Sequence, residues 1–144
     1  MSQNYRMIEC HWHSEFQAKL KIVREQVFIL EQSVPVALEW DEHDATAIHL
    51  LALDAQEQAI ACARILITNG SIGRMAVMPA WRGLGVGSAL LDKAVAICKA
   101  HAIGNISLSA QTHALGFYQK AGFKVSSAPY LDVDIWHVDM QLEV

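Results

Sequence analysis

The sequence predicts one α/β (α+β) domain, built on a central twisted sheet that is mixed but mostly antiparallel, with about six or seven strands and about four flanking helices. Three observations predict this fold. The chain has 144 residues, of which 53% are hydrophobic, which suits one domain with a substantial core. Apolar residues recur every three or four positions in some stretches and every second position in others, so helices and strands both occur. Asn69-Gly70 joins two strand-like runs, which favours antiparallel pairing.

The first elements are a strand over residues 6–10 and a long helix. Ser14-x-x-Gln17 is expected to form a capping box that opens the helix, which continues to about Glu31. Its predicted core stripe comprises Phe16, Leu20, Val23, Val27 and Leu30. Ser33-Val34-Pro35 ends the helix, and the acidic segment 39–44 is expected to be a surface loop.

Three strands should follow as a meander. Residues 47–53 and 59–67 are strand-like and are joined by a polar turn over 54–58. Asn69-Gly70 predicts a type I′ turn, so residues 72–78 should run antiparallel to the preceding strand.

The second half alternates helices with strands. A helix is expected from about Gly85 to Ala100, with a left-handed cap near Gly104. The strand over 106–110 should be parallel to 72–78, because a helical crossover joins the two. A short helix over 113–120 should end in a Schellman motif at Gly122, and a strand should close the chain where Trp136, Val138, Met140 and Leu142 alternate with His137, Asp139 and Gln141.

The stretch between the strand at 72–78 and the next helix has the pattern of a phosphate-binding loop. Pro79 stops the strand, and glycines 83, 85 and 87 follow at every second position before the helix. Glycines permit close approach of a ligand, while the free N–H groups and the positive end of the helix dipole favour a phosphate. Arg82 adds a positive charge. A glycine turn without a ligand is the alternative.

Two nucleotide-binding motifs do not fit this stretch. A P-loop would place lysine after the last glycine, where this chain has Ser88. A Rossmann fingerprint would need a third glycine at that position and an acidic residue about 20 positions later, where the chain has an apolar strand.

The remaining pattern, Arg82-x-x-Gly85-x-Gly87, resembles the pyrophosphate loop Arg/Gln-x-x-Gly-x-Gly/Ala of the GNAT superfamily of acyl-CoA-dependent N-acyltransferases. A second motif, Gln111-x-x-Ala114-x-x-Phe117-Tyr118-x-x-x-Gly122-Phe123, is similar to the superfamily's Asn-x-x-Ala-x-x-Leu-Tyr-x-x-x-Gly-Phe, with Gln111 in place of the usual asparagine. The order of elements matches over nearly the whole chain.

The amino-terminal half resembles the ElaA-like branch of this superfamily. The similar residues are Arg24-x-x-Val27-Phe28-x-x-Glu31-Gln32-x-x-Pro35, Glu39-x-Asp41 and the closing His137-x-x-Met140. That branch usually has Gly-Ile-Pro-His before the last strand, whereas this chain has Asp134-Ile135-Trp136-His137.

The resemblance implies acetyl-CoA as acyl donor and a GNAT-like fold, with residues 1–144 as one N-acetyltransferase domain. It implies that the strand residues Ala76 and Val77 contact the pantetheine arm, and that the parallel strands diverge to admit the thioester. The other implied cofactor contacts are Arg82, Gly83, Leu84, Gly85, Val86, Gly87, Ser88, Gln111, Phe117 and Tyr118.

Acetyl transfer to an amine needs a base, because an alkyl amine of pKa about 10.4 is neutral only about once in 10³ to 10⁴ molecules at pH 7. Glu31 and His137 are the candidates, and a solvated carboxylate and a structural histidine are the respective alternatives. Asp41 and Asp44 offer electrostatic binding of an ammonium group instead. By the resemblance, Tyr118 protonates the departing thiolate.

Composition limits the partners and the location. A net charge of −4 without a basic run argues against nucleic acid and is compatible with a cationic substrate. No apolar run approaches the roughly 18 residues of a membrane span, and the polar start over residues 1–6 is unlike a secretory signal. We therefore expect a soluble, cytoplasmic protein without a membrane partner. Cys10, Cys62 and Cys98 are widely spaced in apolar surroundings, so we expect core residues rather than a metal site, and no metal.

The predicted function is transfer of an acetyl group to a primary amine by direct attack in a ternary complex. Covalent catalysis through Cys98 or Cys62 is the enzymic alternative, and neither residue lies where a thiolate is favoured. A non-catalytic acyl-CoA-binding or interaction module is the rival class. The acceptor is a small molecule or a protein amino group, and the superfamily implies a homodimer.

Overall fold

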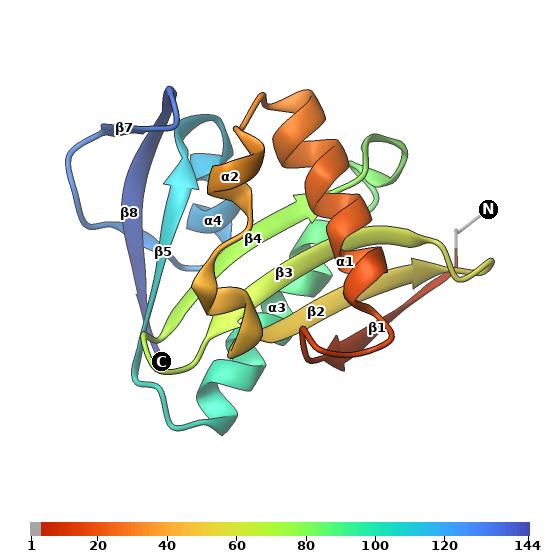
Figure 1. The fold of residues 1–144 in the computed structure, drawn as a ribbon. Coiled ribbons are helices and arrows are strands. Elements are labelled where there is room, and N and C mark those ends of the chain that lie inside the picture. The colour runs from red at the N-terminus through yellow and green to blue at the C-terminus, as the bar shows by residue number, and fades with distance from the viewer. Residues whose placement is uncertain (1–3) are drawn as a thin grey trace.

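The computed structural model describes residues 4–144, in which the strands form one open mixed sheet (Figure 1). The sheet has eight strands in the order β1-β2-β3-β4-β5-β8-β6, with β7 paired to β8. Within residues 4–144, β4 and β5 are the one pair of neighbouring strands that run parallel. The strands are β1 (Tyr5–Cys10), β2 (Ile48–Asp54), β3 (Ala59–Leu66), β4 (Ser71–Val77), β5 (Asn105–Gln111), β6 (Lys124–Val125), β7 (Tyr130–Asp132) and β8 (Ile135–Glu143). The mixed, mostly antiparallel sheet is confirmed, and the short strands β6 and β7 enlarge it. Residues 1–3, part of the polar start, lie outside the described residues.

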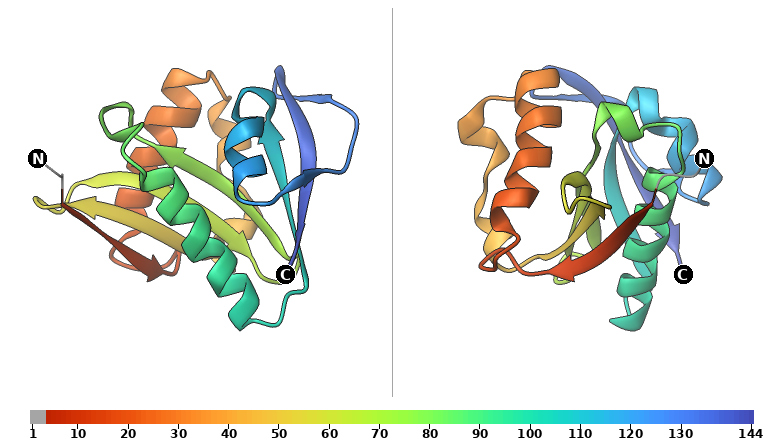
Figure 2. Two further views of the ribbon diagram at one scale, coloured as in Figure 1. Left: turned by 180° about the vertical axis from the view of Figure 1, so that it is seen from behind. Right: turned by 90° about the vertical axis from the view of Figure 1, so that its right-hand side faces the viewer.

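Helices cover both faces of the sheet, with α1 and α2 on one face and α3 and α4 on the other (Figure 2). The α-helices are α1 (Gln17–Arg24), α2 (Val36–Glu39), α3 (Val86–Ala100) and α4 (Leu115–Lys120). A π-helix, η1 (Glu25–Glu31), continues α1, and short 3-10 turns lie at η2 (Glu42–Ala45), η3 (Pro79–Trp81) and η4 (Thr112–Ala114).

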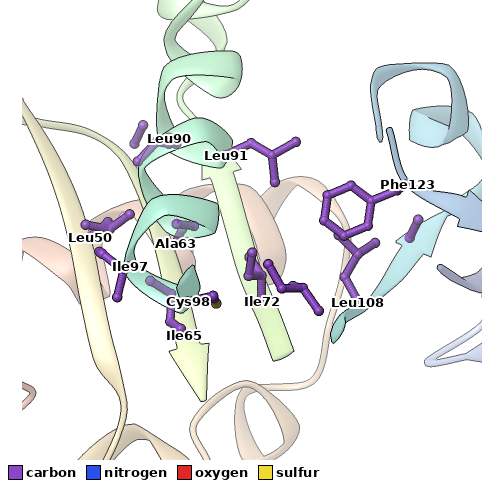
Figure 3. Close-up of a cluster of buried hydrophobic side chains, with 14 of the residues drawn as sticks. Leu50, Ala63, Ile65, Ile72, Leu90, Leu91, Ile97, Cys98, Leu108 and Phe123 are labelled. Atoms are coloured by element: carbon purple, nitrogen blue, oxygen red, sulfur yellow. The ribbon is translucent and has the colours of Figure 1, made fainter. Parts of the chain in front are cut away.

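The larger core lies between α3 and the sheet. Leu90 and Leu91 of α3 pack over Ile65, Ile72 and neighbouring strand residues, and Phe123 extends this layer toward β5 (Figure 3). Each fully buried leucine contributes about 1.5–3 kcal/mol through removal of apolar surface from water. A second cluster on the other face holds α1 against β2 and β3. All three cysteines are buried and free, as predicted.

The first helix differs from the prediction at both ends. It begins at Gln17 without a capping box, because Ser14 Oγ accepts from the Phe16 N–H at 3.2 Å and the Gln17 side chain donates to the Trp12 carbonyl at 3.0 Å. From Glu25 the chain widens into η1. The wider turn changes the periodicity, so Leu30, predicted in the core stripe, is 61% exposed.

The acidic segment 39–44 is not the predicted surface loop. Glu39 ends α2 and Asp44 lies in η2, and each is only 2% exposed. Both carboxylates bind buried arginines, which compensates the cost of removing them from water.

The hairpin between β3 and β4 is confirmed, but the prediction of a type I′ turn is wrong. In the turn over 67–70 only Gly70 has a positive φ, of 62°, whereas a type I′ turn needs two such residues. The two-residue turn with positive φ at both positions instead joins β7 to β8, at Val133 (48°) and Asp134 (61°).

The structure confirms the end of α4 and the closing strand, but it places the left-handed residue after α3 at another position. The left-handed residue after α3 is Ala102, with φ 59°, rather than Gly104. The Schellman motif after α4 is confirmed, because Gly122 has φ 100° and the Phe123 N–H donates to the Tyr118 carbonyl at 3.2 Å. In β8 Trp136 is 53% exposed, since it pairs only with exposed Leu131 of the short β7.

A bulge in β4 opens the sheet where the site forms. Gly73 pairs with Arg64 while Ala76 pairs with Cys62, so the register shifts, and Arg74 has φ 46°. Strand β4 pairs with β5 only through residues 71–72 and 107–108, and beyond them the two strands diverge (Figure 1). The predicted slot between these parallel strands is therefore present.

Candidate active site

A cavity of about 1150 Å³ occupies the space between the diverging strands. Its walls come from η1, β4, β5, α4 and the hairpin of β7 and β8. Nine of the residues predicted from the sequence lie in the walls: Glu31, Ala76, Val77, Arg82, Gly87, Gln111, Phe117, Tyr118 and His137. Residues 83–86 and Ser88 lie outside the cavity. The structure thus brings the predicted catalytic residues and most of the predicted cofactor residues to one place.

The glycine loop has the geometry of an anion site. Gly83 and Gly85 have φ angles of 74° and 86°, which side chains other than glycine rarely adopt, and a Cβ at either position would meet open space. The amide N–H groups from Gly83 to Ser88 make no hydrogen bond within residues 4–144. They lie at the N-terminal end of α3, where the helix dipole adds positive potential.

Gly87 lies beside the second predicted motif. A Cβ at Gly87 would lie 3.4 Å from the ring carbon Cζ of Phe117, which is van der Waals contact. Val86, by contrast, is only 1% exposed and anchors the start of α3 in the core. The loop is therefore held on one side by the core and on the other by α4.

These features fit an acyl-CoA. A pyrophosphate suits the unpaired amides of the loop. Ala76 and Val77 pair with β3 on one side, and their other side faces the slot where β5 has moved away. A peptide-like arm can add to such an open strand edge.

Arg82 of the loop and Glu31 of η1 form an ion pair. Arg82 Nη1 and Nη2 donate to the two carboxylate oxygens of Glu31 at 2.8 and 2.6 Å, and Nε donates to the Val77 carbonyl at 2.9 Å. The hydrogen bond from Arg82 lowers the pKa of Glu31. The residue predicted as a base is thus paired with the residue predicted at the phosphate loop.

Tyr118 has an apolar environment. Burial raises the pKa of its phenol to about 12, so the hydroxyl stays protonated at neutral pH. Its ring contacts Phe117 and Phe123 edge-on, with centroids 5.0 and 6.2 Å apart, and its oxygen lies 3.8 Å from Met75 Sδ in β4. The hydroxyl therefore lies at the slot without a strong acceptor.

His137 is 9% exposed and lies opposite Gln111 in the pairing of β5 with β8. Its Nδ1 lies 2.7 Å from the Ile135 carbonyl oxygen. Since a carbonyl only accepts, Nδ1 carries a hydrogen, so the proton-accepting nitrogen of this tautomer is Nε2. Tyr130 stacks on the imidazole of His137, with the two ring centroids 6.0 Å apart. The Tyr130 hydroxyl donates to Asp139 Oδ1 at 2.6 Å, so the phenol ring that covers one face of the imidazole is itself held in place.

Two glutamines connect the sides of the slot. Gln111, at the end of β5, donates to the side-chain carbonyl of Gln32 at 2.8 Å. Gln32 directly follows η1, so this bond links the helical layer to the sheet above the cavity.

The largest group missed from sequence is a buried ionic network. Arg24, 1% exposed, donates to Glu39 and Asp44 at 2.7 Å, and Arg64 donates to Asp41 and Asp44 at 2.7 and 3.1 Å. Asp41 and Asp44, considered for binding an ammonium group, are thus paired with arginines. The one sequence feature that pointed to this network was the presence of Arg24 and Glu39-x-Asp41 in the pattern of the ElaA-like branch.

The structure does not support covalent catalysis by a cysteine. Burial raises the pKa of the Cys62 thiol to about 12 and that of Cys10 to about 11, so both stay protonated. Neither these two nor Cys98 lies in the cavity walls.

Two features are absent from residues 4–144. No three or more His, Cys, Asp or Glu side chains in this part of the chain are arranged to hold a metal ion. None of the helices described for it has the length and apolar character needed to cross a membrane.

Comparison with known proteins gives a consistent result. The family model described as "Acetyltransferase (GNAT) domain" matches residues 14–144. Protein ElaA of Escherichia coli (strain K12) is 33% identical over 138 residues, which cover 91% of this chain and 89% of that protein. YjcF of Bacillus subtilis (strain 168), described as an uncharacterized N-acetyltransferase, is 36% identical over 124 residues, covering 82% of this chain and 86% of that protein.

Solved structures agree. The crystal structure of Escherichia coli ElaA matches with a TM-score of 0.87 at 30% identity, covering 97% of this chain and 100% of that chain. A Pseudomonas aeruginosa structure described as an acyl-CoA N-acyltransferase matches with a TM-score of 0.83 at 29% identity, covering 97% of this chain and 99% of that chain. The two sequence motifs, the slot between β4 and β5 and these comparisons agree: this chain belongs to the GNAT acetyltransferase family, in its ElaA-like branch.

Proposed function

We propose that this protein transfers the acetyl group of acetyl-CoA to a primary amine by direct attack in a ternary complex. The observation that carries the proposal is the slot between β4 and β5, which joins a loop of unpaired amides to Tyr118 and His137. We take residues 1–144 as one N-acetyltransferase domain, acting in the cytoplasm.

The donor would be held along the glycine loop and the open edge of β4. Amides of residues 83–88 would bind the pyrophosphate, with Arg82 beside them, and Ala76 and Val77 would bind the pantetheine arm. Gln111, Phe117 and Tyr118 would border the thioester, which supplies an activated acyl carbon when bound.

His137 is our first candidate for the base. Deprotonating an alkyl amine at pH 7 costs roughly 4 to 5 kcal/mol, so a positioned acceptor for its proton is needed. Nε2 of His137 is the proton-accepting nitrogen and belongs to a cavity residue, so it can take the proton directly or through water. Glu31 is the second candidate, but its ion pair with Arg82 favours a positioning role.

Tyr118 is proposed as the acid that protonates the departing sulfur. The parent thiol has a pKa of about 8.5 in water if it resembles cysteine. The Tyr118 phenol, whose burial raises its pKa to about 12, retains its proton at neutral pH and can give it to the thiolate as the thiolate leaves.

The first experiment is an equilibrium titration with coenzyme A. We expect saturable binding well below millimolar concentration, and an excess of free adenosine should compete weakly because it lacks the pyrophosphate. Absence of binding at millimolar coenzyme A would remove the donor from the proposal.

The second experiment separates the enzyme from a non-catalytic acyl-CoA-binding module. Release of free thiol from acetyl-CoA is followed with polyamines, amino acids, aminated drugs and a lysine-rich peptide. Amine-dependent release supports the enzyme, and slow hydrolysis without acceleration by any amine supports the module. Glu31→Gln and His137→Ala, measured beside the parent protein, assign the base. Mass measurement in solution tests the expected homodimer.

A further inference from the structure

We infer that the acceptor amine carries a carboxylate, which binds the guanidinium groups of Arg64 and Arg74 in the wall of the cavity. This inference rests on the proposed function and specifies its acceptor. The evidence is two arginines of the cavity wall that retain unused N–H groups.

Arg64 has a free edge of hydrogen-bond donors. The residue is only 6% exposed, and its hydrogen bonds within residues 4–144 all come from Nη1, to Asp41 and Asp44. Nε is buried without a partner, and Nη2 donates to no group in residues 4–144. Nε and Nη2 form the side of the guanidinium whose two parallel N–H groups fit a carboxylate.

Arg74 adds a second free group beside it. Its Nη2 binds the carbonyls of Leu38 and Glu39 and the carboxylate of Asp41. Its Nε lies 3.1 Å from Glu39 Oε2 but without hydrogen-bond geometry, and it too is buried without a partner. No bond from Nη1 exists within residues 4–144. Asp41 binds both Arg64 and Arg74, so the unpaired N–H groups of the two arginines lie in the same wall of the cavity.

An unpaired buried donor is costly, which is why it points to a ligand. Leaving a charged donor without a partner costs more than leaving a neutral one, and most buried polar atoms in proteins are paired. The three carboxylates of the network are already shared among Arg24, Arg64 and Arg74, and none of them reaches the free edge of Arg64. A planar acceptor with two oxygens would complete the pairing.

The register of the sheet limits the size of the acceptor. Arg64 lies opposite Gly73, and Met75, whose Sδ lies 3.8 Å from the Tyr118 oxygen, follows two residues later along β4. At about 3.3 Å per residue, the wall and the hydroxyl that would border the thioester are separated by roughly 7 Å along the strand, part of which the long arginine side chain spans. A short amino acid therefore fits better than a carboxylate on a long chain.

The test compares matched acceptors on the parent protein by initial rates of thiol release. Glycine, β-alanine and 6-aminohexanoate are each paired with their methyl esters and with alkylamines of the same length. We expect kcat/KM for the short amino acids to exceed that of the ester and alkylamine partners about tenfold or more, through a lower KM. Equal rates within pairs, or a preference for O-phosphoethanolamine over β-alanine, would overturn the inference.

A variant locates the effect. Arg64→Lys retains a charge but lacks the two parallel donors, so the ratio of kcat/KM for amino acid over alkylamine should fall about tenfold or more. The ratio is taken within one protein preparation, so partial loss of folded protein cancels. Arg6→Lys is the control, since Arg6 pairs with Glu57 outside the cavity and should keep the parent ratio. An unchanged ratio in Arg64→Lys would contradict the assignment.

The outcomes separate this inference from the proposed function. If no amine accelerates thiol release, the transferase itself fails. If alkylamines and esters serve as well as amino acids, the transferase stands and the carboxylate site fails.

Discussion

The hydroxyl of Tyr118 meets the slot from an almost wholly apolar environment. Phe117 and Phe123 contact its ring, and Met75 Sδ lies 3.8 Å from its oxygen. Such surroundings disfavour the phenolate and place the pKa at about 12, so the residue retains a proton to give across the whole physiological range.

Tyr118→Phe should therefore lower kcat by roughly 10² to 10⁴, the usual contribution of general acid catalysis. The affinity for coenzyme A, measured by titration, should change little because the aromatic ring is kept. Tyr5→Phe is the control, since Tyr5 packs edge-on against Trp81 away from the cavity. An unchanged turnover number in Tyr118→Phe would remove the acid role.

Gly85→Ala should weaken the binding of coenzyme A. Alanine at φ 86° costs about 1 kcal/mol or more, so the loop would shift to relieve the strain and misalign its amides. Gly104→Ala is a matched control, because a Cβ there meets open space and the backbone is not in the left-handed region. Titration of both variants with coenzyme A measures the effect, and equal affinities would contradict it.

The residues that were predicted well belong to short continuous motifs. Gly83 and Gly85 of the glycine loop and Gly122 have positive φ angles, which a few neighbouring residues determine. The spacing of these glycines along the chain is therefore enough to predict their turns. Arg64 and Arg74 could not be identified in this way. The partners of Arg64 lie 20 to 23 positions away and those of Arg74 lie 33 to 36 positions away, and the bulge in β4 and the folding of 39–44 over the sheet bring them together.

At the scale of elements, the charges of Arg24 in α1 and Arg64 in β3 hold α2 and η2 in place. Arg24 of α1 binds Glu39 and Asp44, and its guanidinium lies 4.9 Å from the ring centroid of Trp40. Burial raises the pKa of Asp44, but the hydrogen bond and charge of Arg24 outweigh it, so the pKa lies below its usual value of 3.8.

Asp44→Asn should destabilise the protein at pH 7 by about 3–5 kcal/mol, because two buried arginines lose a charged partner. A depressed carboxyl pKa contributes stability above the unfolded value and loses it as pH falls through the folded value. The difference between parent and variant should therefore shrink below about pH 4. Urea unfolding at several pH values measures it, with the exposed Asp92→Asn as control. A difference independent of pH would contradict this account.

The strands and helices themselves were largely predictable, because each has its own apolar pattern. The apolar run over 59–67 and the stripe Leu20, Val23 and Val27 gave the right elements. The segments that escaped prediction are η1, where a wider helix breaks the period, and β6 and β7, which are too short to alternate. Tertiary pairing with β8, rather than local sequence, makes those two segments strands.

For the whole molecule, the cavity lies where both helical layers and both halves of the sheet meet. A donor bound there would contact η1, β4, α3 and α4 at once. A ligand that binds the folded state alone raises the free energy of unfolding by RT ln(1 + c/Kd), so the rise depends on the ligand concentration c relative to its dissociation constant.

Coenzyme A at a hundred times its dissociation constant should therefore raise the free energy of unfolding by about 2.7 kcal/mol. In a protein of this size that corresponds to a rise in Tm of roughly 5 to 10 °C, measurable by thermal denaturation. Gly85→Ala should show a smaller rise at the same concentration. No rise for the parent protein under saturating conditions would argue against binding to the folded state.

The π-helix η1 sets the direction of Glu31 and Gln32, which bind Arg82 and Gln111 across the slot. Each residue of an ordinary helix advances the side chains by about 100°. A π-helix turns by a smaller angle per residue, so winding the same seven residues, 25–31, as an ordinary α-helix would rotate both side chains away from their partners. The wider winding of this one segment therefore determines where Glu31 and Gln32 point.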